Sequence, residues 1–173
     1  MGRKSTKANK NIYQILREEL GWSREEAESR MNGLMTADRI AKIEGNKSQP
    51  YPMEVLNMSE VYGQPALCNY YCTNECEIGA KYVPEVKLNT NLSQIVLEIL
   101  NSLNSLQKGS ERLIEISVDG RIEDNEIKDF IAIQKELDNI SVTVNALKIW
   151  AEKKLSEGKI NRELYDKLYE SAG

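Results

Sequence analysis

Residues 22–46 read WSREEAESRMNGLMTADRIAKIEGN, and this stretch decides the fold. Ser23, followed three residues later by Glu26, forms a capping box in which each side chain bonds the other residue's backbone N–H. The pattern predicts a helix that begins after Ser23 and runs to about Met31. Asn32-Gly33 then indicates a turn, because both residues tolerate the backbone conformations that close tight turns.

Another helix follows this turn. Thr36 is a good N-cap residue, since its hydroxyl accepts a backbone N–H of the first turn. Ile40 and Ile43 lie at helical spacing and predict a buried face. Gly45-Asn46 predicts the end of the helix. The stretch therefore predicts two short helices joined by a tight turn.

One more helix is predicted on each side of this pair. Apolar residues over 9–21 recur on one helical face, and the helix predicted there ends at Gly21. Prolines at 50 and 52 indicate an extended connector, after which residues 53–62 are predicted to be helical. Residues 9–64 are thus expected to form one four-helix domain, preceded by a disordered basic arm, residues 1–8.

The rest of the chain also has helical patterning, so the predicted fold class is all-α. Residues 65–88 are expected to be a cysteine-bearing helical linker whose helix closes at Gly79. A C-terminal helical domain is expected over 89–173. Its predicted parts are a helix from Leu92 that Gly109 interrupts, a short stretch around 113–116, a long helix within 124–157, and a final short hairpin.

Composition narrows the functional class. No run of about 18 apolar residues is present, so no membrane span is expected. The polar N-terminus has no apolar core of a secretory signal, which predicts a cytoplasmic protein. The 173 residues contain no histidine, and neither a Gly-rich phosphate loop nor a nucleophile–base pair is recognisable. The chain is therefore not expected to be an enzyme.

Charge is unevenly distributed along the chain. Residues 1–47 contain ten Lys or Arg and seven Asp or Glu, whereas the remaining residues contain thirteen and twenty. A slightly basic N-terminal part on an acidic body is compatible with a small DNA-binding domain joined to a protein-contacting tail.

The segments LREELGWSREEAE (16–28) and RIAKIEGNKSQPYPMEVLNMSEVYG (39–63) resemble, in order, the helix-turn-helix domain of Xre/Cro-type transcriptional regulators. The resemblance covers about residues 9–64. It implies a lambda-repressor-like domain, double-stranded DNA as partner, and a nucleoid location when bound. The distance from Ser23 to Glu44 exceeds the family's by about two residues, with the excess near Asn32–Met35.

The resemblance also implies which residues face DNA. The third helix would present its N-terminal side chains to the major groove, and Arg39 is suited to a bidentate contact with guanine. Asp38 would either accept from cytosine or favour the helix N-terminus. Phosphate contacts are expected from Arg24, which opens the second helix, and from Asn46 and Lys47, which follow the third. The implied DNA-binding residues are Arg24, Thr36, Ala37, Asp38, Arg39, Lys42, Asn46 and Lys47.

The cysteines Cys68, Cys72 and Cys76 are spaced four residues apart, which places them on nearly one face of a continuous helix. Three thiolates and a fourth ligand would suit zinc or an iron–sulfur cluster. The spacing is not that of a zinc knuckle and no fourth cysteine exists, so packing is the favoured role and no cofactor is expected. The segment resembles one in helix-turn-helix regulators of anaerobic Firmicutes.

The apolar residues of the C-terminal helices are compatible with two arrangements. The apolar residues of 92–106 and 127–155 would close an intrachain hairpin or pair between two chains, and a homodimer is the favoured expectation. Alternatively, the tail binds another protein and the N-terminal domain is a degenerate remnant, which would make the chain an adaptor.

Residues 115–126 have the outline of a calcium loop. Glu115 is longer than the Asp that the first position of such a loop requires, and Ser117 supplies no charge at the third position. The segment is therefore predicted to be a helix connector without useful calcium affinity.

Overall fold

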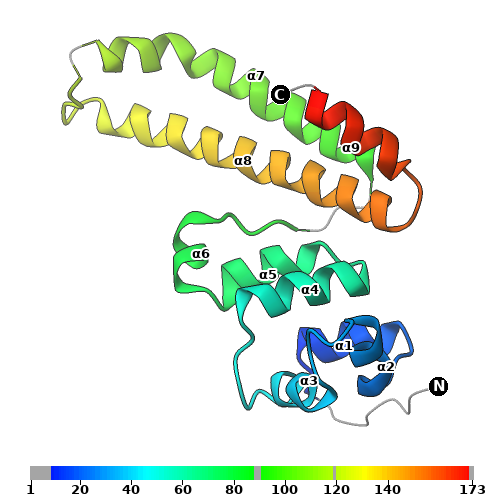
Figure 1. Cartoon of the computed structure of the whole chain (residues 1–173). Helices are drawn as coiled ribbons and strands as arrows, with labels where there is room; N and C mark the ends of the chain where they lie inside the picture. The colour runs from blue at the N-terminus through cyan, green and yellow to red at the C-terminus, as the bar shows by residue number, and fades with distance from the viewer. Residues whose placement is uncertain (1–8, 88–90, 119, 172–173) are drawn as a thin grey trace. The chain divides into compact units, whose positions relative to one another are not determined.

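The computed structural model describes residues 9–87, 91–118 and 120–171, and these contain nine α-helices and no strand (Figure 1). The all-α prediction is confirmed. The predicted arm at residues 1–8 and the position Asp119 lie outside the described residues. The helices are α1 (Ile12–Glu19), α2 (Arg24–Arg30), α3 (Ala37–Glu44), α4 (Pro52–Tyr62), α5 (Ala66–Asn74), α6 (Glu77–Tyr82), α7 (Leu92–Ser117), α8 (Ile127–Ser156) and α9 (Arg162–Ser171).

The chain divides into two compact units. The first contains the described residues up to Val83 together with those from Glu152 onward. The second spans Pro84–Ala151. Of the segment expected to be a linker, residues 65–83 belong to the first unit and residues from Pro84 onward to the second, and the segment expected to be one C-terminal domain is shared between the two. No described helix is both long and apolar enough to cross a bilayer.

The core of the first unit is formed by apolar side chains from α1 to α5 and from the α2–α3 turn. All are nearly inaccessible to solvent, and each contributes roughly 1.5–3 kcal/mol when a large side chain is fully buried. The members are Tyr13, Ala27, Met31, Met35, Ile40, Ile43, Val55, Met58, Tyr62 and Leu67.

The α2–α3 turn has the geometry that its residues favour. Asn32 and Gly33 adopt left-handed φ values of 51° and 79°, which an Asn-Gly pair tolerates. Buried Met31 and Met35 anchor the two ends of the turn. The residues between Met31 and Met35 therefore form a loop that points outward, with exposed Leu34 at its tip.

A buried ion cluster joins α1, α2 and α3. Glu44 accepts from Arg17 Nε at 2.5 Å and Nη2 at 2.8 Å. It also accepts from Arg24 Nε at 2.8 Å. Because the Glu44 side chain is 1 % exposed, loss of its partners would leave a buried charge uncompensated, a change that typically costs about 3–5 kcal/mol.

The cysteine segment is not the continuous helix that its spacing predicted. α5 ends at Asn74 and α6 begins at Glu77, because the Glu75 and Cys76 N–H groups both turn back to Tyr71 O. Gly79 does not close the helix but lies within α6. A Cβ there would lie 2.2 Å from Cys72 O, so this glycine allows α6 to pack closely against α5.

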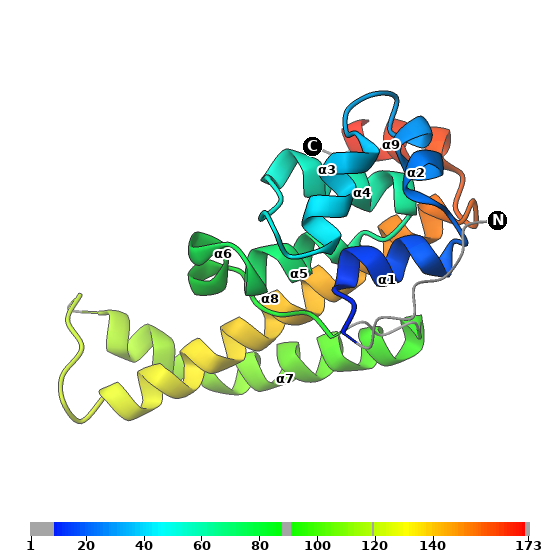
Figure 2. The ribbon, with the colours of Figure 1, turned by 90° about the horizontal axis from the view of Figure 1, so that it is seen from below.

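The predicted interruption at Gly109 is also wrong, since α7 runs unbroken from Leu92 to Ser117. Glycine in a helix interior lowers helix stability by only about 1 kcal/mol relative to alanine, and the absence of a side chain at Gly109 allows α8 to approach closely. A Cβ at Gly109 would lie 3.3 Å from Ile133 Cγ1. α7 and α8 therefore lie side by side as a hairpin, visible in both views (Figure 1 and Figure 2), and Arg112 Nε bonds Asp129 Oδ2 across it at 2.8 Å.

Candidate nucleic-acid interface

α3 has a buried face and an exposed face. Ile40, Ile43 and Glu44 are buried against the core. Asp38 and Lys42 lie on the opposite side, with side chains 75 % and 53 % exposed. The exposed face of α3 is therefore available to a partner without any rearrangement of the core.

Thr36 and Ala37 begin this helix. Thr36 Oγ1 accepts the N–H of Arg39 at 3.2 Å, as its predicted role as N-cap requires. The Ala37 N–H is taken by the Glu28 carboxylate of α2 at 3.0 Å. Glu28 thus fixes α2 against the start of α3 and uses one of the N–H groups that an approaching phosphate would otherwise contact.

Lys42 is paired with Asp38 one turn earlier, at 2.6 Å. Both side chains are exposed, and such pairs contribute only about 0.3–0.5 kcal/mol. Lys42 can therefore exchange Asp38 for a DNA acceptor at little cost.

Arg39 is held inside the first unit by four hydrogen bonds. Its Nε and Nη2 donate to Glu54 Oε1 and Oε2, both at 2.7 Å. Its Nη1 donates to Ser48 Oγ at 2.6 Å, and Nη2 also donates to Gln49 O at 2.9 Å. A bidentate guanine contact by Arg39 would have to replace these bonds. In this geometry Arg39 instead holds Ser48 and Gln49, and so fixes the connector between α3 and α4.

Arg24 begins α2, whereas Asn46 and Lys47 follow α3. Arg24 is tied to Glu44 through Nε, yet 41 % of its side chain stays exposed. Asn46 has a left-handed φ of 53°, and its Oδ1 accepts from Asn11 Nδ2 at 2.9 Å. Lys47 is exposed and forms no ion pair with a described residue. Of the three, Lys47 has the side chain most readily offered to a phosphate.

Charge pairing weakens the electrostatic attraction that this domain can exert on DNA. Residues 9–64 contain seven Lys or Arg and nine Asp or Glu. Five of the seven basic side chains form ion pairs with carboxylates of the same domain, namely those of Lys10, Arg17, Arg24, Arg39 and Lys42. Charge counting along the sequence did not reveal this, because the partners of Arg17, Arg24 and Arg39 are 15 to 27 residues away in the chain.

The three cysteines are distributed over α5 and the residue that precedes α6. Cys68 and Cys72 lie on α5, whereas Cys76 precedes α6 and its Sγ accepts the Gly79 N–H at 3.4 Å. Burial raises the pKa of the Cys72 thiol. Within the described residues, no group of three or more Cys, Asp or Glu side chains is arranged to hold a metal ion.

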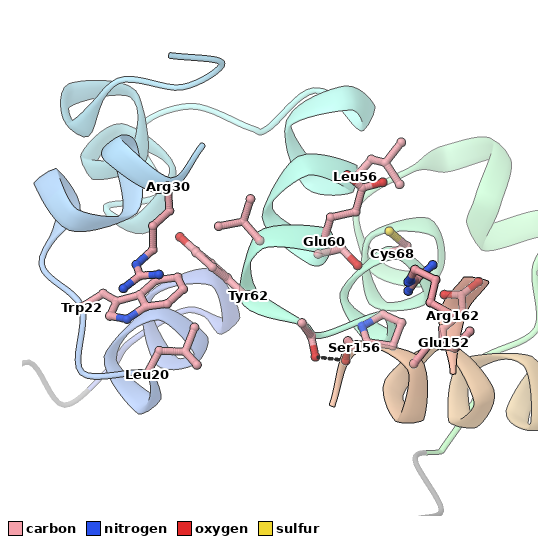
Figure 3. Close-up of a pocket in the computed structure, with 15 residues that line it drawn as sticks. Leu20, Trp22, Arg30, Leu56, Glu60, Tyr62, Cys68, Glu152, Ser156 and Arg162 are labelled. Carbon is pink, nitrogen blue, oxygen red and sulfur yellow. Dashed lines mark hydrogen bonds between the residues drawn. The ribbon is translucent and has the colours of Figure 1, made fainter. Parts of the chain in front are cut away.

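A cavity of about 870 Å³ lies beside the end of α4 (Figure 3). Arg30 stacks over the Trp22 ring at 4.2 Å, and Trp22 meets Tyr62 edge to face. Glu152, Leu155 and Ser156 of α8 also line the cavity, and Lys153 donates to the Gly63 carbonyl at 2.8 Å, where its charge interacts favourably with the C-terminal end of α4. The cavity thus marks where the end of α8 packs on the domain, a contact that sequence periodicity gave no means of predicting.

The Arg39–Glu54 pair is the other feature that sequence reasoning missed. The sequence contained part of the signal, since Glu54 follows Tyr51 at capping-box spacing. The Tyr51 N–H does donate to Glu54 Oε2, at 2.7 Å. Searches for similar proteins found no matching family model, no matching curated protein and no matching solved structure.

Proposed function

We propose that the chain is a sequence-specific DNA-binding transcriptional regulator that acts as a dimer. The observation that carries the proposal is the pair α2 and α3: two short helices joined by a tight turn, of which the second has an outer face with Asp38 and Lys42 exposed. In the helix-turn-helix arrangement, such a second helix enters the major groove.

Roles follow from which side chains are available. Thr36, Ala37, Asp38 and Lys42 lie on or beside the exposed face of α3 and would meet base edges. Lys47 and the exposed part of Arg24 would meet phosphates. Arg39 is assigned to positioning. It donates hydrogen bonds to Ser48 and Gln49, the residues after Lys47, while its ion pair with Glu54 holds the guanidinium in place.

The buried Glu44 cluster supports the same proposal. It ties α1, α2 and α3 through charged hydrogen bonds. A groove-reading helix must be presented rigidly, because small displacements lose the directional hydrogen bonds to base edges. The cluster provides that rigidity.

A second candidate is favoured by the charge pairing described above. A domain with nine acidic and seven basic residues, most of the latter paired, also suits an adaptor that no longer binds DNA. The two candidates differ in one measurable property, which is selection of a DNA sequence.

The test is selection by the full chain from a pool of randomised double-stranded DNA at near-physiological salt. A regulator enriches one motif, with two related half-sites if the chain is a dimer. Lys42→Glu should abolish the enrichment, whereas Lys81→Glu, a matched exposed lysine on α6, should leave it intact. Absence of any enriched motif with the wild-type chain would favour the adaptor.

A further inference from the structure

The surface of α7 offers a second apolar stripe that the α7–α8 hairpin does not cover. One heptad-spaced stripe is buried or half-buried in the chain and contains Ile95, Ile99, Ser102, Leu106, Gly109, Leu113 and Ile116. A second stripe contains Leu92, Val96, Leu100 and Leu103, whose side chains remain between 38 % and 52 % exposed.

The angle between these stripes indicates what covers the second one. At about 100° per residue, the two stripes point roughly 100° apart around α7. A helix that contacts a single neighbour needs one stripe, whereas a helix in a four-helix bundle contacts two neighbours at about this angle. Within the unit Pro84–Ala151, the hairpin supplies one neighbour of α7 and no second one.

We infer that the second neighbour is α7 of another copy of this chain. The segment 92–107 contains one charged residue, Glu98, which lies on the opposite, polar side of α7 from the second stripe. Two such faces meet without like-charge repulsion, although the chain carries a net charge of −4. Two hairpins joined through α7 complete a bundle of four helices. This inference specifies the dimer of the proposed function, but it does not depend on DNA binding.

The inference also resolves the two readings of the apolar residues 92–106. The stripe through Ile95, Ile99 and Leu106 serves the intrachain hairpin. The stripe through Val96, Leu100 and Leu103 serves the contact between copies. One helix therefore performs both functions with different faces.

The test is the mass of the full chain in solution, measured by sedimentation equilibrium over a range of micromolar concentrations. The wild-type chain should be a dimer. Leu100→Ala, which preserves helix propensity, should raise the dimer dissociation constant at least tenfold, and Leu100→Glu should give a monomer. Leu97→Glu is the matched control, because Leu97 is 66 % exposed on the same helix but points about 100° away from the stripe.

Circular dichroism of each variant checks that helix content is retained. A wild-type chain that is monomeric throughout this range overturns the inference, as does a dimer that Leu100→Glu leaves intact while the variant stays helical. A monomeric chain would remove the dimer from the proposed function, but neither result bears on sequence-selective DNA binding. Selection from randomised DNA tests that binding separately, so the two failures are distinguishable.

Discussion

Arg39 and Glu54 form a bidentate ion pair, with both N–H···O distances at 2.7 Å, that bridges α3 to the first turn of α4. The same guanidinium bonds Ser48 Oγ and Gln49 O and lies over the Tyr51 ring at 5.2 Å. The pair therefore fixes both ends of the connector that follows α3. An arginine that would be read from sequence as a base-contacting residue is, in this geometry, a positioning residue.

The pair predicts strongly non-additive stability changes. Arg39→Ala and Glu54→Gln should each lower the free energy of unfolding by about 1–3 kcal/mol, as expected for charged, partly buried hydrogen bonds. The double variant should cost little more than either alone, because both changes remove the same interaction. Urea unfolding of the four proteins measures this. Additive losses would show that the two side chains act independently.

Acid should weaken the pair in a defined direction. Hydrogen bonds from Arg39 hold the pKa of the Glu54 carboxyl below its ordinary value. A depressed folded-state pKa stabilises the fold above the unfolded-state pKa, and this stabilisation is lost as pH falls through the folded-state value. The wild-type chain should therefore lose more stability below about pH 4.5 than Glu54→Gln does. Thermal unfolding between pH 3 and pH 7 is the measurement, and parallel curves for the two proteins would contradict the prediction.

Local signals along the sequence predicted the helix-forming segments well because they act within one or two turns. The capping box at Ser23 and Glu26 is present with both bonds, and Thr36 caps α3. The signals failed where the partner is distant. Gly109 was read as a break because its packing partner, Ile133, lies in another helix. The roles of Arg39 and Lys153 likewise depend on groups 15 and about 90 residues away, which no local pattern contains.

Gly79→Ala should destabilise the packing of α6 on α5. The added methyl group would lie 2.2 Å from Cys72 O. Both the helix that carries residue 79 and the atom it would meet are backbone, which cannot move aside as a flexible side chain would. Overpacking of this kind typically costs about 1–3 kcal/mol. Ala80→Ser, at the neighbouring exposed position, should be nearly neutral. The prediction fails if chemical denaturation ranks the two variants as equally stable.

The last prediction separates two kinds of DNA contact and applies to whatever motif the full chain selects. Lys42 lies on the exposed face of α3 and Lys47 just beyond its end. Lys42→Ala should therefore weaken binding to the selected motif by roughly 1–3 kcal/mol and relax selectivity at one base position. Lys47→Ala should weaken binding to all sequences alike and should lower the slope of log K against log salt by about one.

Titrations of the selected motif, a single-base variant of it and an unrelated duplex at several salt concentrations distinguish these outcomes. Arg39→Ala provides an internal comparison. As a positioning residue, it should reduce affinity for the motif without transferring preference to another base at a single position. If Arg39→Ala instead relaxes one base position while Lys42→Ala does not, Arg39 leaves Glu54 on binding and reads the groove itself. The Arg39–Glu54 ion pair would then exist only in the chain without DNA.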